Sequence, residues 1–202
     1  MIMEVEILVE GYTDELFVRK CFELLQIPLG TVYGKRGSTY IVEKASGFAI
    51  RGNYSPILIL ADLMDMPAPC APAARQLLAA DLPEHALLRF AVPEIESWLI
   101  ASRSELAGFL GISEGLIPEI PDGVEDPKRT LVNLARRSPR RKIRDMFVPR
   151  GGSTAVVGAG YVDGFAQFLS LHWQLESAKN ASPSFSRFVE RTTQCFLSLQ
   201  NA

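Results

Sequence analysis

The stretch Ile57-Leu58-Ile59-Leu60-Ala61-Asp62 decides the fold class of this chain. Its apolar residues are continuous rather than alternating, which is typical of a central strand in a parallel sheet covered by helices on both faces. A second apolar run, residues 5–9, has the same character, and residues 85–92 indicate a further strand. Between these runs the apolar residues recur at helical spacing. This alternation predicts a Rossmann-like α/β fold with a mostly parallel sheet flanked by helices.

The second half of the chain has a different character. Strand signals fade beyond residue 103, and apolar spacing predicts short helices at residues 104–111, 127–137, 139–146, 161–173 and 184–198. The sequence therefore predicts two parts. An α/β core spans residues 1–102, and a mainly helical C-terminal region spans residues 103–202.

Composition excludes several classes of protein. Apolar residues make up 48% and charged residues 22% of the 202 residues, which is enough for a packed core. The three cysteines include no C-x-x-C pair and there are only two histidines, so zinc ribbons, disulfide frameworks and multi-histidine zinc sites are excluded. No apolar run approaches the length of a membrane span, and no basic leader precedes a cleavable apolar stretch. We therefore expect a cytoplasmic protein with no membrane partner.

Basic residues concentrate in one segment. Residues 128–150 contain nine Lys and Arg against one acid and carry +8, whereas the chain has a net charge of −2 and its remainder carries −10. Such a segment is suited to contact the phosphates of a nucleic acid, although a solvated helix face paired with acidic neighbours is an equal alternative. The predicted nucleic-acid-binding residues are Lys128, Arg129, Arg136, Arg137, Arg140, Arg141, Lys142 and Arg144.

Acidic residues follow the two most apolar predicted strands. Glu10 ends the first strand and Asp62 ends the central one, with Asp65 three residues further along. The carboxyl ends of parallel strands form the ligand crevice of an open sheet, and carboxylates that converge there favour Mg²⁺ or Mn²⁺. Because a carboxylate beside a buried strand is costly without a partner charge, we predict that Glu10, Asp62 and Asp65 are catalytic residues that bind this metal.

This arrangement resembles the Toprim domain over about residues 4–100. The resemblance lies in Glu10 and Asp14, followed by the acids Asp62 and Asp65. It implies a Toprim-like α/β sheet in which a strand-end Glu and an Asp-x-Asp pair hold a divalent metal and act on a phosphodiester. Glu10 matches the family Glu and Asp62 the first Asp, whereas Met64 stands at the second Asp position. The resemblance also implies that Asp14 joins a metal, although such an acid is more often a helix N-terminal charge.

The remaining motifs are similar to those of a narrower group of Toprim-like bacterial proteins, related to OLD-type nucleases. They lie at residues 93–99, 126–129 and 182–188. Some members are encoded beside ABC-type ATPases and are connected with anti-phage defence, which implies an ATPase partner. Glu94 and Glu96 follow a third strand end and are predicted metal ligands, although acids also belong in a first helical turn.

The sequence therefore predicts an enzyme, a Mg²⁺-dependent Toprim-type nuclease that hydrolyses DNA, with RNA left open. Lys128 would neutralise the scissile phosphate, and the basic segment would seat the polymer. Primase and topoisomerase are poor fits because the chain has no zinc ligands, no GxxxxGK[ST] motif and no tyrosine placed by a motif. Two alternatives remain: a non-catalytic Toprim-like module that binds nucleic acid or a partner, and a phosphatase or nucleotide hydrolase that uses the same acids.

Overall fold

The chain forms two compact units in the computed structural model, which describes residues 3–197. The first unit combines the chain up to Val92 with the segment from Ser186 onward, and the second runs from Pro93 to Phe185. The sequence analysis divides the chain after residue 102 instead, and it assigns the whole C-terminal region to one part. The two differ because the last helix returns to the first unit.

The first unit is an α/β structure with an all-parallel, four-stranded sheet in the order β2-β1-β3-β4, which confirms the predicted fold class. In register, β3 pairs Asp62 with Ala91 of β4, and β1 pairs Val9 with Gly34 of β2. The elements are β1 (Val5–Val9), α1 (Tyr12–Leu25), β2 (Leu29–Gly34), α2 (Ser38–Ala49), η1 (Ile50–Asn53), β3 (Ile57–Asp62), η2 (Leu63–Asp65), α3 (Ala71–Leu78), β4 (Ala86–Ala91) and, from Ser186 onward, α10 (Pro183–Leu197).

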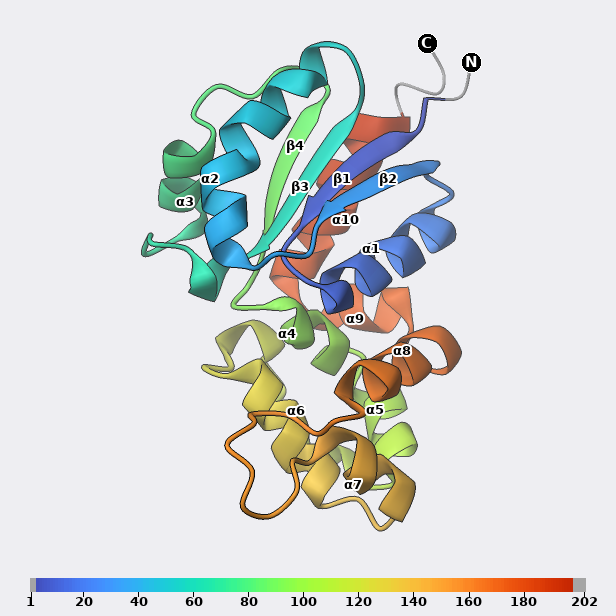
Figure 1. The fold of residues 1–202 in the computed structure, drawn as a ribbon. Coiled ribbons are helices and arrows are strands. Elements are labelled where there is room, and N and C mark those ends of the chain that lie inside the picture. Colours follow the sequence, from blue (N-terminus) through green and yellow to red (C-terminus); the bar gives the residue numbers. More distant parts are fainter. Residues whose placement is uncertain (1–2, 198–202) are drawn as a thin grey trace. The chain divides into compact units, whose positions relative to one another are not determined.

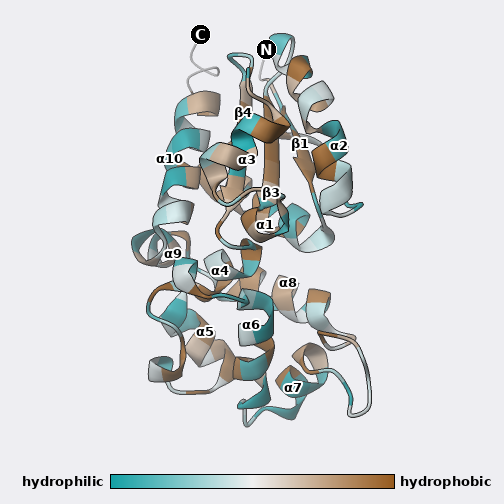
Figure 2. Cartoon of the chain, turned by 90° about the vertical axis from the view of Figure 1, so that its left-hand side faces the viewer, coloured by the Kyte–Doolittle hydropathy of each residue, from teal (hydrophilic) through white to brown (hydrophobic). Residues whose placement is uncertain are grey.

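Helices cover both faces of this sheet (Figure 1). On one face lie α2 and α3, where strand residues such as Leu8 and Ile59 pack with Ile41 in a shared core. On the other face lie α1 and α10, whose Phe22 and Phe196 rings have centroids 6.4 Å apart. All six residues of β3 are buried, and the strand is brown in the hydropathy view of Figure 2. Burial on both faces is the reason why the β3 sequence is continuously apolar.

The second unit is helical. It contains α4 (Ile95–Ile100), α5 (Arg103–Leu110), η3 (Glu114–Leu116), η4 (Pro121–Gly123), α6 (Pro127–Arg136), α7 (Arg141–Phe147), α8 (Tyr161–Leu171) and α9 (Leu175–Ala181). Its centre includes Trp98, whose Nε1 donates to Ser184 Oγ at 2.7 Å and whose carbonyl accepts from Trp173 Nε1 at 3.0 Å. The ring of Phe185 is 5.3 Å from that of Trp98. Trp98 is therefore a core residue of the second unit.

Two helix starts differ from what residue type alone indicates. Thr13 is of a residue type that often caps helices, but α1 begins at Tyr12 and Gly11 is its N-cap. The reason is that the Asp14 carboxylate accepts a hydrogen bond from the Gly11 N–H at 2.6 Å. Pro93 is predicted as the first helical residue of the next helix, but the extended backbone of Glu94 makes that residue the N-cap of α4.

Membrane-spanning helices were also sought in the structure. Within residues 3–197, no helix combines the length and the apolar character that crossing a bilayer requires.

Candidate functional site

Two predicted metal ligands lie side by side at the carboxyl edge of the sheet, the edge at which β1 and β3 end. Glu10 follows β1, and Asp62 is the last residue of β3, the strand next to β1. The Asp62 backbone N–H donates to Glu10 Oε1 at 2.9 Å, a contact between residues 52 positions apart in the chain. Both residues are buried, with 8% and 6% of their surface exposed. Parallel pairing of the two strands is what brings these acids together.

Tight turns hold the backbone at this edge. Gly34, at the end of β2, has φ +92°, and a Cβ at this position would collide with the Val9 carbonyl. Directly after it, the Lys35 N–H donates to Val9 O and the Gly37 N–H donates to Glu10 O, both at 3.0 Å. Only glycine adopts such a conformation at low cost, and it allows the β2–α2 connection to approach the main chain of Glu10.

The first turn of α1 contains two further acids. Asp14 is 4% exposed, and its carboxylate caps the helix start through Gly11. Glu15 pairs with Lys35 at 2.9 Å and with Arg19 at 2.7 Å. Burial alone would raise the pKa of Glu15, but the hydrogen bonds and charges of Lys35 and Arg19 outweigh burial and lower it. Asp14 therefore has a structural role next to Glu10, and its predicted role as a metal ligand stays a prediction.

Asp65 lies in η2, directly after β3, and its side chain is exposed. Met64, which occupies the second Asp position of the Toprim pattern, is 47% exposed. No hydrogen bond or ion pair of Asp65 occurs within the described chain, so the structure provides no contact that brings its carboxylate to Glu10 or Asp62. Its predicted catalytic role stays a prediction.

The second unit brings together Glu94, Glu96, Lys128 and Tyr161, which we call the Lys128 cluster. Lys128 Nζ lies 3.0 Å from Glu94 Oε2 and 3.5 Å from Glu96 Oε1. The hydroxyl of Tyr161 donates to Glu96 Oε1 at 2.8 Å. The side chains of Glu94 and Glu96 are only 4% and 0% exposed, whereas that of Lys128 is 37% exposed. The sequence analysis singles out both acids and the lysine, but as separate features.

Glu94 occupies its position because it satisfies a helix start. Its Oε1 accepts from the backbone N–H of Lys128 at 2.5 Å, one residue into α6 after Pro127. A carboxylate at the N-terminus of a helix is stabilised by the unpaired N–H groups and by the helix dipole. One carboxylate oxygen of Glu94 and one of Glu96 lie within 4.8 Å of each other. Two carboxylate oxygens this close together can bind a hard cation. In this structure the Lys128 ammonium lies beside both carboxylates and supplies the positive charge.

The predicted basic segment is divided between structural and exposed residues. Arg140 donates to the Phe109 carbonyl at 2.6 Å, and Arg144 donates to the Ser138 carbonyl at 2.5 Å. Arg141 is exposed and pairs with Asp145 at 3.5 Å. The remaining predicted contacts are exposed side chains, namely Arg129, Arg136, Arg137 and Lys142.

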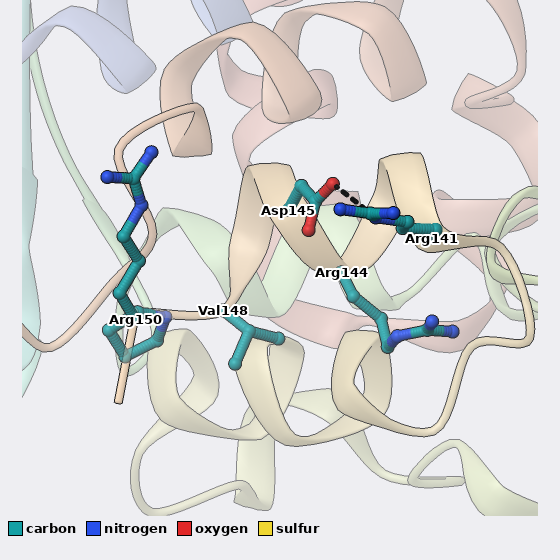
Figure 3. Close-up of a pocket in the computed structure, with 6 residues that line it drawn as sticks. Arg141, Arg144, Asp145, Val148 and Arg150 are labelled. Carbon is teal, nitrogen blue, oxygen red and sulfur yellow. Dashed lines mark ion pairs between the residues drawn. The ribbon is translucent and has the colours of Figure 1, made fainter. Parts of the chain in front are cut away.

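A pocket of about 490 Å³ lies along α7 and the chain that follows it. It is lined by Arg141, Arg144, Asp145, Val148, Pro149 and Arg150. Figure 3 shows Arg141 beside Asp145, with the guanidinium groups of Arg144 and Arg150 well apart. The lining is mainly basic, in agreement with the charge of the segment.

Two residues of interest escape the sequence analysis. Tyr161 lies at the start of α8, 65 residues from Glu96, and no spacing pattern connects the two. Arg89 lies in β4, where a single arginine in a short strand carries no motif. Both become visible only through tertiary packing.

Comparison with known protein families, with curated proteins and with solved structures finds no match to this chain. The functional argument therefore depends on the residues and their geometry.

Proposed function

We propose that this chain is a Mg²⁺- or Mn²⁺-dependent nuclease of the Toprim type that hydrolyses phosphodiester bonds of DNA. The observation that supports the proposal is the hydrogen bond from the Asp62 backbone N–H to the Glu10 carboxylate, which joins two buried acidic residues at the carboxyl edge of a parallel sheet. This edge is where open α/β sheets bind their ligands.

The donor set fits a hard divalent cation. Glu10 and Asp62 offer carboxylate oxygens, which Mg²⁺ and Mn²⁺ prefer, and both residues are too buried for water to screen their charges fully. When bound, the metal supplies Lewis-acid stabilisation of phosphate charge and lowers the pKa of a coordinated water. In the proposal Glu10 and Asp62 hold the metal, and Asp65 and Asp14 are the nearest additional acids in sequence.

The Lys128 cluster has the groups to act on the phosphate itself. In the proposal the Lys128 ammonium, which is partly exposed, neutralises a nonbridging phosphate oxygen, while Glu94 and Glu96 orient it through their ion pairs. The same two acids are the proposed ligands of a second cation, which would replace the Lys128 ammonium between them. The exposed basic residues of segment 128–150 contact the polymer backbone.

Cleavage tests this proposal. Supercoiled plasmid and a structured RNA are incubated with Mg²⁺ or Mn²⁺ and with the parent protein, Glu10→Gln or Asp62→Asn. Glu23→Gln is the matched control, because Glu23 is exposed and belongs only to a surface ion pair with Lys20. The proposal expects metal-dependent cleavage that falls by about 10²–10⁴-fold in the first two variants and stays unchanged in the control. Cleavage that persists in both site variants would contradict it.

A second candidate function is a non-catalytic module that binds nucleic acid or a partner protein. Met64 at the second Asp position favours it, because a methionine supplies no oxygen ligand. Nucleic-acid binding without cleavage under any of the metal conditions above would support this alternative. A preference for mononucleotides over polymers would instead indicate a nucleotide hydrolase or phosphatase.

The resemblance to Toprim-like proteins supports two further parts of the proposal. The nuclease would act in the cytoplasm as the effector subunit of an anti-phage system, with an ABC-type ATPase as its partner. Co-purification of the chain with the product of a neighbouring ATPase gene tests this part, and its failure would leave a nuclease that acts alone.

A further inference from the structure

Three arginines of the first unit belong to β4, the edge strand of the sheet, and to α10. Arg89 belongs to β4, and Arg187 and Arg191 lie four residues apart on α10, so that they share one face of that helix. Arg191 lines a pocket of about 340 Å³ together with Ala86 and Leu87 of β4. The arginine surface, as we call it, consists of Arg89, Arg187 and Arg191.

These arginines lack the partners that arginines normally have. Within the described chain none of the three forms an ion pair with an acid, and Arg191 donates to Gln194 Oε1 at 3.2 Å. Glu84 lines the pocket with Arg191, and Glu190 on α10 accepts instead from Ser186. Glu84 and Glu190 therefore lie near Arg191 without forming an ion pair with it in the described chain.

Arg89 is the most unusual member. Its Nε is buried and has no hydrogen-bond partner in the described part of the chain. Burial lowers the pKa of Arg89, and the positive charges of Arg187, Arg191 and Arg75 lower it further. A guanidinium remains protonated at neutral pH even so. A buried N–H donor that makes no hydrogen bond is unfavourable, and a phosphate oxygen beside Arg89 would satisfy it.

We propose that the arginine surface binds successive phosphates of a nucleic-acid backbone. Guanidinium groups match the oxygens of a phosphodiester in charge and in geometry, and a phosphate oxygen would accept from the Arg89 N–H groups. Arg187 and Arg191 are separated by one helical turn, about 6 Å, and Arg89 adds a third charge from β4, so the charges extend further than a single phosphate ion spans. An extended polyanion is therefore the ligand that uses all three.

The position of the surface agrees with the proposed function, on which this inference rests for the identity of the polymer. Arg191 lies beside the start of β4, and Arg187 lies one turn earlier in α10, whose direction is opposite to that of the strand. From Arg191 to Arg187 the surface thus leads toward the carboxyl end of β4, where Ala91 is the register partner of Asp62. A strand bound there would run along the edge of the sheet toward the proposed metal site.

Binding to a fluorescein-labelled single-stranded oligodeoxynucleotide tests the inference. Fluorescence anisotropy is measured in EDTA over a series of salt concentrations, so that no metal or cleavage enters the result. The variant Arg187→Gln/Arg191→Gln removes two exposed charges. The control Lys44→Gln/Lys179→Gln removes the same charge from α2 and α9, elements to which no residue of the arginine surface belongs.

The loss of two phosphate contacts should lower the slope of log K against log salt by about 1.4, and should weaken binding roughly ten- to thirtyfold at 0.1 M salt. The control should bind like the parent protein. A variant with lysine at both positions should keep most of the affinity, because lysine retains the charge, and thermal unfolding by circular dichroism establishes that each variant is folded.

Binding of Arg187→Gln/Arg191→Gln that equals the control would overturn the inference. Since the assay excludes metal, it also separates this inference from the proposed nuclease activity. A protein that cleaves plasmid but binds normally without the two arginines refutes only the arginine surface. A protein that needs the arginines to bind DNA but never cleaves it refutes only the nuclease.

Discussion

Replacement of Lys128 by Met offers a sharp test of how the second unit is held together. The ammonium lies 3.0 Å and 3.5 Å from two carboxylates whose side chains are 4% and 0% exposed. Met keeps the length of the aliphatic stem and the helix propensity, and the backbone N–H that Glu94 accepts from is retained. The substitution therefore removes the cation and little else.

The size of the effect follows from these distances. At an effective dielectric constant of about 20, each contact is worth roughly 5 kcal/mol before further screening. Lys128 is 37% exposed, so solvent screens much of this attraction. Breaking a fully buried ion pair lowers the free energy of unfolding by about 3–5 kcal/mol, and we expect Lys128→Met to lower it by about 2–3 kcal/mol. For a chain of this size the midpoint of thermal unfolding should fall by roughly 4–12 °C.

The assay is thermal unfolding by calorimetry, with Lys179→Met as the matched control. Lys179 also lies 3.5 Å from a glutamate, Glu176, but that glutamate side chain is 72% exposed. Lys179→Met should lower the free energy of unfolding by less than about 1 kcal/mol. In Glu96→Gln/Lys128→Met, removal of one buried negative charge should restore part of the lost stability. Equal losses for Lys128→Met and Lys179→Met would refute the argument that burial makes the Lys128 cluster strong.

Three further predictions concern the first unit. In a denaturant titration, Gly34→Ala should lower the free energy of unfolding by at least about 2 kcal/mol, because the φ of +92° and the nearby Val9 carbonyl exclude a Cβ. In the control Gly47→Ala in α2, the new Cβ meets nothing within 4 Å, so this variant should be as stable as the parent protein or more stable. Glu15→Gln should lower the free energy of unfolding by about 0.5–1 kcal/mol at pH 7. Because the pKa of Glu15 is lowered in the folded state, this contribution exists above the unfolded pKa of 4.5 and disappears as pH falls through the folded pKa. A difference between the two proteins that persists at pH 2 would contradict this prediction. Cys70 is exposed and should react with a thiol reagent in the native protein, whereas burial raises the pKa of Cys21 well above 9.0 and should protect it until unfolding; equal labelling rates would be the contrary result.

Much of the fold can be predicted from the sequence because the strongest signals are local. The apolar run that becomes β3 is buried on both faces, so its composition alone indicates a central strand. The start of α1 is less accessible to such reasoning, because a hydrogen bond from Gly11 to Asp14 moves the helix start ahead of Thr13. Helix α9 was not predicted at all, since its seven residues include only one buried side chain and so give no apolar stripe.

The candidate site shows the same division. Glu10 and Asp62 are predictable neighbours, because each stands at the carboxyl end of an apolar strand. In a parallel sheet, all strands have their carboxyl ends at the same edge. The Glu94 side chain could not be assigned to the start of α6 from sequence, since the two lie more than 30 residues apart. The unsatisfied Nε of Arg89 is likewise a property of packing and not of any motif.

The contact between Glu10 and Asp62 carries the account, and calorimetric titration with Mg²⁺ and Mn²⁺ tests it most directly. The account predicts a binding heat for the parent protein and for Glu23→Gln, and an affinity at least about tenfold lower for both Glu10→Gln and Asp62→Asn. A parent protein that binds neither ion at millimolar concentration, or site variants that bind as tightly as the parent, would contradict it.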